Sequence, residues 1–156
     1  MVYLDHAAGS FVYESVKKEY LKCLDNYANP NSAHAKGLQN KEIIDAKTKE
    51  IANMLGVTSD SIIYTSGATE SNNLAIFGVA YRYKNYGKHI IISSIEHTSI
   101  TAPVTKLQQE GFSVSVLNVV NGHIDINELK SLIRDDTILV SITALDSEVG
   151  CIINID

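Results

Sequence analysis

Three polar segments of the chain contain residue types that bind anions or transfer protons: residues 65–70, 93–97 and 143–150. In the first, Gly67 lies between a short apolar run and a helix-like stretch, so the backbone can turn tightly there. The helix that follows would present its unpaired N–H groups and positive dipole end to a ligand. Gly67, Ala68 and Thr69 therefore form a candidate site for a phosphate ester. Taken alone, such a turn more often does no more than begin a helix, with Ser66 as its cap.

His97 is the candidate proton-transfer group of the second segment. An imidazole can stack against a flat aromatic cofactor or move a proton near neutral pH. A lone histidine is more often a surface or core residue, but this one comes directly after an apolar run that is typical of a buried strand. That position favours a functional role.

Each polar segment follows a predicted strand, at residues 61–64, 88–92 and 137–142. Because the carboxyl ends of parallel strands share one edge of a sheet, we expect the three segments to converge there and to line a ligand crevice.

The other elements alternate helix and strand, which predicts an α/β fold with a three-layer, mostly parallel sheet and helices on both faces. We expect one partial cofactor-binding domain over residues 1–156, with an N-terminal arm and helix at 1–32 and a core at 33–156. Ser32 is a candidate N-cap for the second helix and Gly56 its left-handed C-cap. Predicted helices cover residues 12–27, 33–55, 68–83, 98–110 and 125–133, and a further strand covers 113–119.

Composition narrows the function classes. The chain has 156 residues and a formal net charge of −5, with lysines interleaved among acidic residues, so we expect no nucleic-acid partner. Apolar runs are shorter than the roughly 20 residues of a membrane span, and no leader is recognised, so we expect a cytoplasmic protein without a membrane partner. Cys23 and Cys151 have neither metal-ligand spacing nor a disulfide pattern, so no metal site is expected.

The segment Thr65-Ser66-Gly67-Ala68-Thr69-Glu70-Ser71-Asn72-Asn73-Leu74-Ala75 resembles the phosphate-binding signature of the cysteine desulfurases, class V members of the fold-type I pyridoxal-phosphate enzymes. The similarity continues in one register over nearly the whole chain. It includes residues 3–5 with Ala8, residues 29–30 with Ser32 and His34, and residues 87–91, 96–97, 110–112 and 134–141.

The resemblance implies roles for several residues toward pyridoxal 5'-phosphate. Gly67, Ala68 and Thr69 would hold its phosphate, His97 would stack on its ring with a possible part in proton transfer, and Ser147 would donate a hydrogen bond. Asn29 and His34 would lie near the substrate. The family removes sulfur from L-cysteine, which leaves alanine and an enzyme persulfide for iron–sulfur cluster or thio-cofactor assembly. The implied partners are a second copy of the chain or a completing polypeptide, and a sulfur-acceptor or iron–sulfur scaffold protein.

The chain also departs from the family pattern. The Schiff-base lysine, the aspartate that pairs with the pyridine nitrogen and the sulfur-accepting cysteine are expected beyond residue 156, so this chain alone should not turn over. The usual His-Val-Asn-Asn-Glu run is replaced by Ala144, Leu145, Asp146, Ser147 and Glu148, and Gly9 replaces a threonine. Ser147 is shorter than asparagine, and the Asp146 carboxylate is unfavourable beside an anionic oxygen.

The residues leave several alternatives open. Another class V enzyme, a selenocysteine lyase or an aminotransferase, fits the same signature. A non-catalytic remnant that binds a phosphate compound or a partner is favoured by the changes at residues 144–147. A plain α/β domain fits the helix and strand pattern but not the register over the whole chain. Whether the chain is a fragment, half of a split enzyme or a remnant, and its oligomeric state and sulfur acceptor, are not determined by the sequence.

Overall fold

The computed structural model describes residues 2–148 and 150–153. Backbone contacts divide the chain into two compact units, Met1–Tyr64 and Thr65–Asp156, and each is described by itself. That residues 1–156 form a single cofactor-binding domain stays a prediction.

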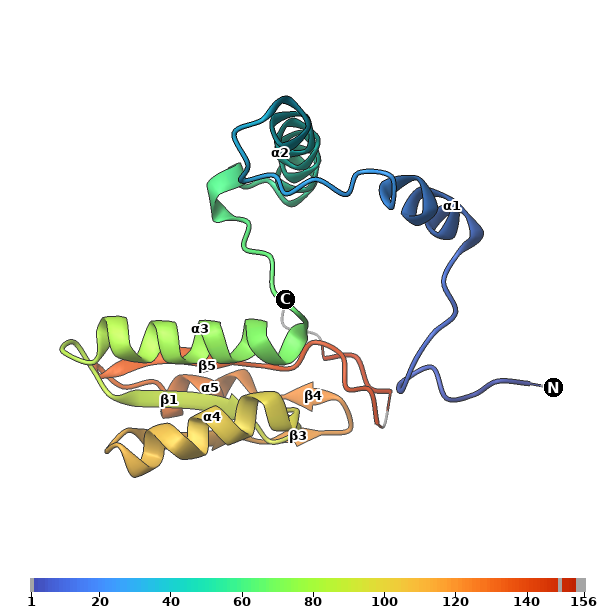
Figure 1. The fold of residues 1–156 in the computed structure, drawn as a ribbon. Coiled ribbons are helices and arrows are strands. Elements are labelled where there is room, and N and C mark those ends of the chain that lie inside the picture. The colour runs from blue at the N-terminus through green and yellow to red at the C-terminus, as the bar shows by residue number, and fades with distance from the viewer. Residues whose placement is uncertain (1, 149, 154–156) are drawn as a thin grey trace. The chain divides into compact units, whose positions relative to one another are not determined.

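The first unit contains α1 (Glu14–Cys23), α2 (Ala35–Leu55) and a 3-10 turn, η1 (Ser59–Ser61) (Figure 1). Gly56 ends α2 in the left-handed conformation with φ 68°, as predicted. The predicted cap at Ser32 is wrong: His34 caps the helix, and its Nδ1 accepts the N–H of Gly37 at 3.1 Å. The chain is still turning at Ser32, whose N–H donates to the Asn29 carbonyl, so the helix begins later.

The predicted strand at residues 61–64 is also not formed. Ser61 closes η1, and residues 62–64 are extended without a strand partner. Ile63 and Tyr64 are exposed. A β-branched run becomes a strand only when a neighbouring strand takes up its backbone hydrogen bonds, and this run has no such neighbour among the described residues.

The second unit is built on a parallel sheet of β1 (His89–Ser93), β2 (Ser113–Leu117) and β5 (Thr137–Ser141) in the order β2-β1-β5. Its helices are α3 (Ala68–Tyr83), α4 (Thr98–Gln109) and α5 (Ile126–Leu132). Figure 1 shows α3 and α4 on the near face of the sheet and α5 behind it. The predicted α/β class, with a parallel sheet between helical layers, is confirmed.

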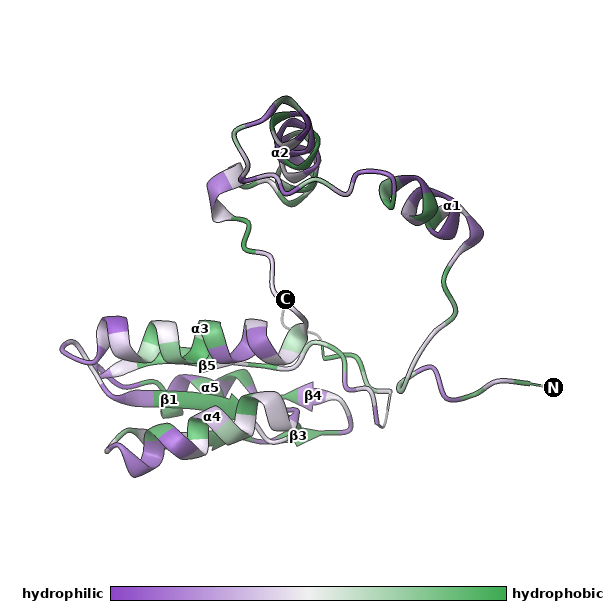
Figure 2. Cartoon of the chain, in the orientation of Figure 1, coloured by the Kyte–Doolittle hydropathy of each residue, from purple (hydrophilic) through white to green (hydrophobic). Residues whose placement is uncertain are grey.

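The core of this unit lies between β1 and the two near helices. All five residues of β1 are buried, and the strand is largely hydrophobic in Figure 2. Ile90 and Ile92 point to one face by the alternation of a strand, where they pack with Ile76 and Ala80 of α3. Val104, Leu107 and Phe112 complete the cluster. This packing fixes the ends of α3 and α4 relative to the carboxyl edge of the sheet.

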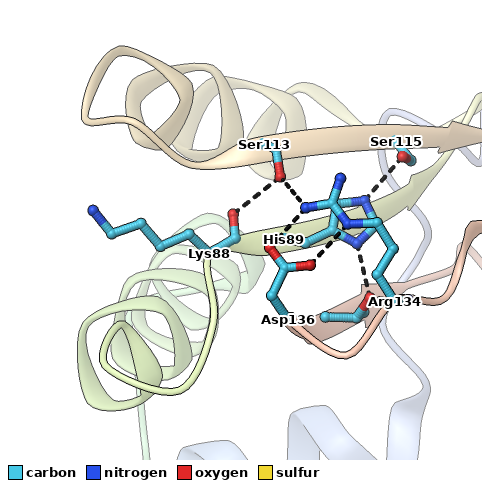
Figure 3. A network of polar contacts seen from close by, with 7 residues as sticks. Lys88, His89, Ser113, Ser115, Arg134 and Asp136 are labelled. Atoms are coloured by element: carbon cyan, nitrogen blue, oxygen red, sulfur yellow. Dashed lines mark hydrogen bonds and ion pairs between the residues drawn. The ribbon is translucent and has the colours of Figure 1, made fainter.

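The amino edge of the sheet is held by a polar network (Figure 3). The ring of His89 is fully buried and contacts the hydroxyls of Thr137 at 2.8 Å and Ser115 at 2.9 Å. Burial, and then the nearby Arg134 charge, lowers the pKa of His89. Because these partners lie on β5 and β2, one imidazole joins all three strands.

A short hairpin follows β2 where the sequence predicted a strand to residue 119. The ladder with β1 ends at Leu117, and β3 (Val119–Val120) pairs antiparallel with β4 (His123–Ile124). Asn121 and Gly122 connect them with φ values of 53° and 76°. Asn-Gly is the preferred pair for this tight turn, because both positions need positive φ.

Within the described part of the chain, no helix combines the length and the apolar character needed to cross a membrane.

Candidate functional site

The start of α3 is an open helix end. Gly67 is the N-cap residue in an extended conformation, and Ala68 and Thr69 form the first turn, with all three exposed. A Cβ placed on Gly67 would meet nothing within 4 Å. The first N–H groups of a helix have no acceptor inside the helix. The structure therefore offers amide donors and free space for an anion at this point.

Glu70 closes the turn before this helix. Its Oε2 accepts the N–H of Ser66 at 2.6 Å and the Ser66 hydroxyl at 2.7 Å, and these bonds lower the pKa of Glu70. Ser66 therefore does not cap α3, which corrects the simpler interpretation of this turn. Its two donors are engaged by Glu70, so the donors left for an anion are those of the helix end itself.

His97 is the N-cap of α4. Its Nδ1 accepts the backbone N–H of Ser99 at 3.1 Å and lies 2.9 Å from the Ser99 hydroxyl. The imidazole is exposed, while Ser99 is buried. Residues 94–97 connect the end of β1 to the start of α4. His97 therefore lies at the carboxyl edge of the sheet.

Glu96 connects the second and third polar segments, and sequence reasoning missed it. Its carboxylate accepts hydrogen bonds from the hydroxyls of Ser93 at 2.8 Å and Thr143 at 2.9 Å. A third hydroxyl, that of Ser141, donates at 3.3 Å. The available signal was a carboxylate next to hydroxyl residues that end two strands. Only the pairing of β1 with β5 shows that these groups are neighbours.

The third segment folds back on itself after β5. The N–H of Asp146 donates to the Cys151 carbonyl at 3.0 Å, and the N–H of Ile153 donates to the Ala144 carbonyl at 2.9 Å. Asp146 Oδ1 also accepts the N–H of Glu148 at 3.1 Å, which makes a side-chain turn. The Asp146 carboxylate therefore has a structural task in shaping this loop.

A cavity of about 560 Å³ lies where the second and third segments meet. This volume is in the range of small-molecule sites, roughly 300–1,000 Å³. His97 and Ser147 both line it, together with three carboxylate residues, Glu96, Asp146 and Glu148. The remaining lining residues are Ser94, Ile95, Thr98, Thr143 and Leu145. The predicted meeting of these two segments at the sheet edge is thus present in the structure.

The prediction that all three segments line one crevice is wrong for the first segment, which is joined to the cavity only indirectly. None of the described lining residues comes from residues 65–70. Asn72, on the second turn of α3, donates its Nδ2 hydrogen to the Ser99 hydroxyl at 2.9 Å, and Ser99 contacts His97. Thr69 and Asn72 are three residues apart on the helix and so share a face. The start of α3 and the ring of His97 are therefore linked through one pair of side chains.

Asn29 and His34 belong to the first unit, so their relation to the cavity stays a prediction. Asn29 Oδ1 accepts the N–H of Asn31 at 2.9 Å, and His34 caps α2. Both have local structural tasks that do not depend on a ligand.

Comparison with known proteins identifies the class of protein: the chain belongs to the aminotransferase class-V family, which it matches over residues 2–156. It is 46% identical to the cysteine desulfurase IscS of Pasteurella multocida (strain Pm70), over 97% of this chain and 39% of that protein. It is 42% identical to the cysteine desulfurase IscS of Pseudoalteromonas translucida (strain TAC 125), over 97% of this chain and 38% of that protein.

Solved structures show the same relationship. A NifS-like protein superposes with a TM-score of 0.91 and 35% identity over 97% of this chain and 42% of the other. SspA in complex with cysteine superposes with a TM-score of 0.84 and 33% identity over 94% of this chain and 43% of the other. The resemblance to the cysteine desulfurases is confirmed. The chain spans about two fifths of the length of these curated relatives, which is consistent with their N-terminal portion.

Proposed function

We propose that this chain is the N-terminal, cofactor-binding part of a pyridoxal-phosphate-dependent cysteine desulfurase. The reaction would remove sulfur from L-cysteine and leave alanine and an enzyme persulfide. The observation that carries the proposal is the cavity at the carboxyl edge of the sheet, with the imidazole of His97 in its wall and the open start of α3 linked to it. The relatives named cysteine desulfurase, and the solved SspA complex with cysteine, support the substrate.

The residues present fit pyridoxal 5'-phosphate. Ala68 and Thr69 would hold the phosphate with first-turn amides and the Thr69 hydroxyl, and the space above Gly67 leaves room for it. His97 would stack on the ring, and Ser147 would donate one hydrogen bond. When bound, the cofactor supplies an electron sink for bond cleavage at the substrate. The residues of this chain would bind and orient the cofactor, and the His97 imidazole would hold a proton.

Other parts of the reaction need residues that this sequence does not provide in the family context. We propose that the Schiff-base lysine, the aspartate for the pyridine nitrogen and the acceptor cysteine come from a continuation of the chain or from a completing polypeptide. The working protein would be a homodimer in the cytoplasm that passes sulfur to an acceptor or iron–sulfur scaffold protein. Residues 1–156 alone would bind the cofactor without turnover.

A titration with pyridoxal 5'-phosphate tests this proposal. The purified chain is followed by its visible spectrum before and after borohydride, beside Thr69→Val and a control, Thr105→Val, on the exposed side of α4. We expect reversible, non-covalent binding that Thr69→Val weakens about tenfold and Thr105→Val leaves unchanged, because of these two threonines only Thr69 lies at the start of α3. Loss of one charge-assisted hydrogen bond corresponds to about that factor.

The other outcomes separate the alternatives. A reduced adduct on one specific lysine would show that the Schiff-base residue lies within residues 1–156, against the proposal. If Thr69→Val binds pyridoxal 5'-phosphate as tightly as the unaltered chain does, the phosphate does not bind at the start of α3. No binding by the unaltered chain would favour the non-catalytic remnant.

A further inference from the structure

Three side chains form a hydrogen-bond relay from α3 to the cavity wall. Asn72 Nδ2 contacts the Ser99 hydroxyl at 2.9 Å, and that hydroxyl contacts His97 Nδ1 at 2.9 Å. The backbone N–H of Ser99 reaches the same Nδ1 at 3.1 Å. Ser99 is buried and Asn72 is half-buried, so the relay runs beneath the exposed imidazole.

The chemistry of the donors sets the direction of each bond. A backbone N–H and an amide NH₂ can only donate. Ser99 N–H therefore requires a lone pair on His97 Nδ1. The Ser99 oxygen accepts from Asn72, and because Nδ1 offers a lone pair and no hydrogen, the 2.9 Å contact between Nδ1 and the Ser99 oxygen has the hydroxyl as its donor. Both bonds to Nδ1 exclude a hydrogen there, and the neutral ring must carry its hydrogen on Nε2.

We infer that Asn72 and Ser99 are positioning residues that hold His97 as the Nε2–H tautomer in the cavity wall. No hydrogen bond to Nε2 occurs among the described residues, so this nitrogen is the one that remains for a ligand. A cavity ligand would therefore meet a hydrogen-bond donor at Nε2 when the ring is neutral. The function of this donor rests on the proposed function, whereas the tautomer itself is a property of the chain without ligand.

Nitrogen-15 NMR of the imidazole groups tests the tautomer in the full chain without cofactor. His97→Asn assigns the ring signals, because the chain has five histidines. We expect the unaltered chain to show the Nε2–H pattern. Ser99→Ala removes the hydroxyl but keeps the bond from the backbone N–H to Nδ1. The ratio of the Nε2–H to the Nδ1–H tautomer of His97 should therefore shift toward Nδ1–H by about 3- to 10-fold, as expected for loss of one neutral hydrogen bond. Ser99→Thr keeps a hydroxyl and should restore the original ratio.

Asn72 is tested by reversing its role. In Asn72→Asp the amide donor becomes a carboxylate, which accepts the Ser99 hydrogen and turns the hydroxyl away from Nδ1. The ratio should shift in the same direction as in Ser99→Ala. Asn73→Ala is the matched control, because that neighbouring amide contacts the Thr69 carbonyl at 2.8 Å and not Ser99. It should leave the His97 signals unchanged.

Two results would overturn the inference. The first is an Nδ1–H pattern of His97 in the unaltered chain. The second is a tautomer ratio that stays unchanged in both Ser99→Ala and Asn72→Asp while circular dichroism shows that both variants are folded. If a variant unfolds, Ser99→Thr and the unaltered chain still decide the point. Failure of pyridoxal 5'-phosphate to bind would count against the proposed function and would not change the tautomer measured without it.

Discussion

Asp146 combines a structural task with an electrostatic cost. Its Oδ1 accepts the Glu148 N–H, and the residue lines the cavity with His97 and Ser147. A second negative charge beside an anionic ligand is unfavourable, while the turn itself needs only an acceptor oxygen. The two effects can be separated because asparagine offers the acceptor without the charge.

We predict that Asp146→Asn strengthens binding of pyridoxal 5'-phosphate. One unit charge in a partly screened site several ångströms away contributes about 1 kcal/mol, or about fivefold in Kd. A fluorescence titration measures it. Asp135→Asn, which removes a charge before the opposite end of β5, is the control and should have little effect. Weaker binding in Asp146→Asn would mean that the carboxylate itself serves the ligand.

The open space at Gly67 predicts that a substitution there lowers ligand affinity more than it lowers the stability of the fold. The backbone is extended there and a Cβ meets nothing within 4 Å, so Gly67→Ala should cost no more than the roughly 1 kcal/mol of an alanine at an N-cap, seen as a small fall in the thermal unfolding temperature. The added methyl group would occupy space above the helix end and lower the affinity for pyridoxal 5'-phosphate about tenfold or more, the equivalent of about 1.4 kcal/mol. Gly78→Ala, in the middle of α3, is the control: it should stabilise the helix by up to about 1 kcal/mol without changing affinity. An unchanged affinity in Gly67→Ala would place the phosphate elsewhere.

The strands of the second unit are joined at both ends by buried or half-buried polar groups. His89 connects the three strands at the amino edge, and Glu96 connects β1 with β5 at the carboxyl edge through Ser93 and Ser141. The middle of the sheet is held by apolar packing. Polar side chains therefore link the strands at both ends of the sheet, and apolar packing holds its middle.

The burial of His89 predicts a pH dependence of stability. Its pKa is lower in the folded chain than the ordinary value of 6.5, so the unfolded state binds more protons as the pH falls below that value. The free energy of unfolding should therefore fall from about pH 7 downward, by at most about 1.4 kcal/mol per pH unit from this residue, and level off below the folded pKa.

Hydrogen exchange of the Ile90–Ile92 amides measures this locally. In His89→Gln the pH-dependent part should be lost, and protection at pH 7 should fall by about 1–3 kcal/mol because a buried hydroxyl loses its partner. His123→Gln, an exposed histidine on β4, should keep the slope of the unaltered chain. If protection changes with pH in His89→Gln as it does in the unaltered chain, the pH dependence comes from groups other than His89.

At the scale of the whole molecule, both units leave large apolar side chains exposed, such as Leu74, Val116 and Val140 in the second unit. The strands β2 and β5 are the two edges of the described sheet, each with one unpaired side. Apolar exposure and open edges favour association with another chain. The curated relatives are more than twice as long as this chain.

We predict that the isolated chain associates with itself in a concentration-dependent way through the β5 edge. Val140→Lys should weaken this association about tenfold, because burial of a valine is worth roughly 1.5 kcal/mol and a lysine opposes strand pairing. Light scattering after size-exclusion chromatography measures it. Val120→Lys, on the two-residue strand β3, should have no effect. A chain that is monomeric at all concentrations would contradict the prediction.

Much of the fold could be predicted from the chain itself, since helix bounds depend on local signals. The predicted helix 68–83 matches α3, and Gly56 ends α2 as expected. The errors occur where a distant partner decides the structure. Residues 61–64 have the composition of a strand without a neighbour, and the strand expected to reach residue 119 ends at Leu117, where its ladder with β1 ends.

In the site, too, local signals could be predicted and contacts between distant residues could not. Residue types and order predicted His97 and the start of α3 as site residues, and the resemblance added Ser147 and the family that the comparisons confirm. Glu96, Ser99 and Asn72 were not predicted to have a role in the site, because a carboxylate, a hydroxyl or an amide has no recognisable role until its partner is known. Their partners lie 27 to 47 residues away in the chain for the Asn72–Ser99 and Glu96–Thr143 bonds. Local sequence determined which groups are present, and only the packing of α3, α4 and β5 around β1 decided which of them meet, because hydrogen bonds require contact in space.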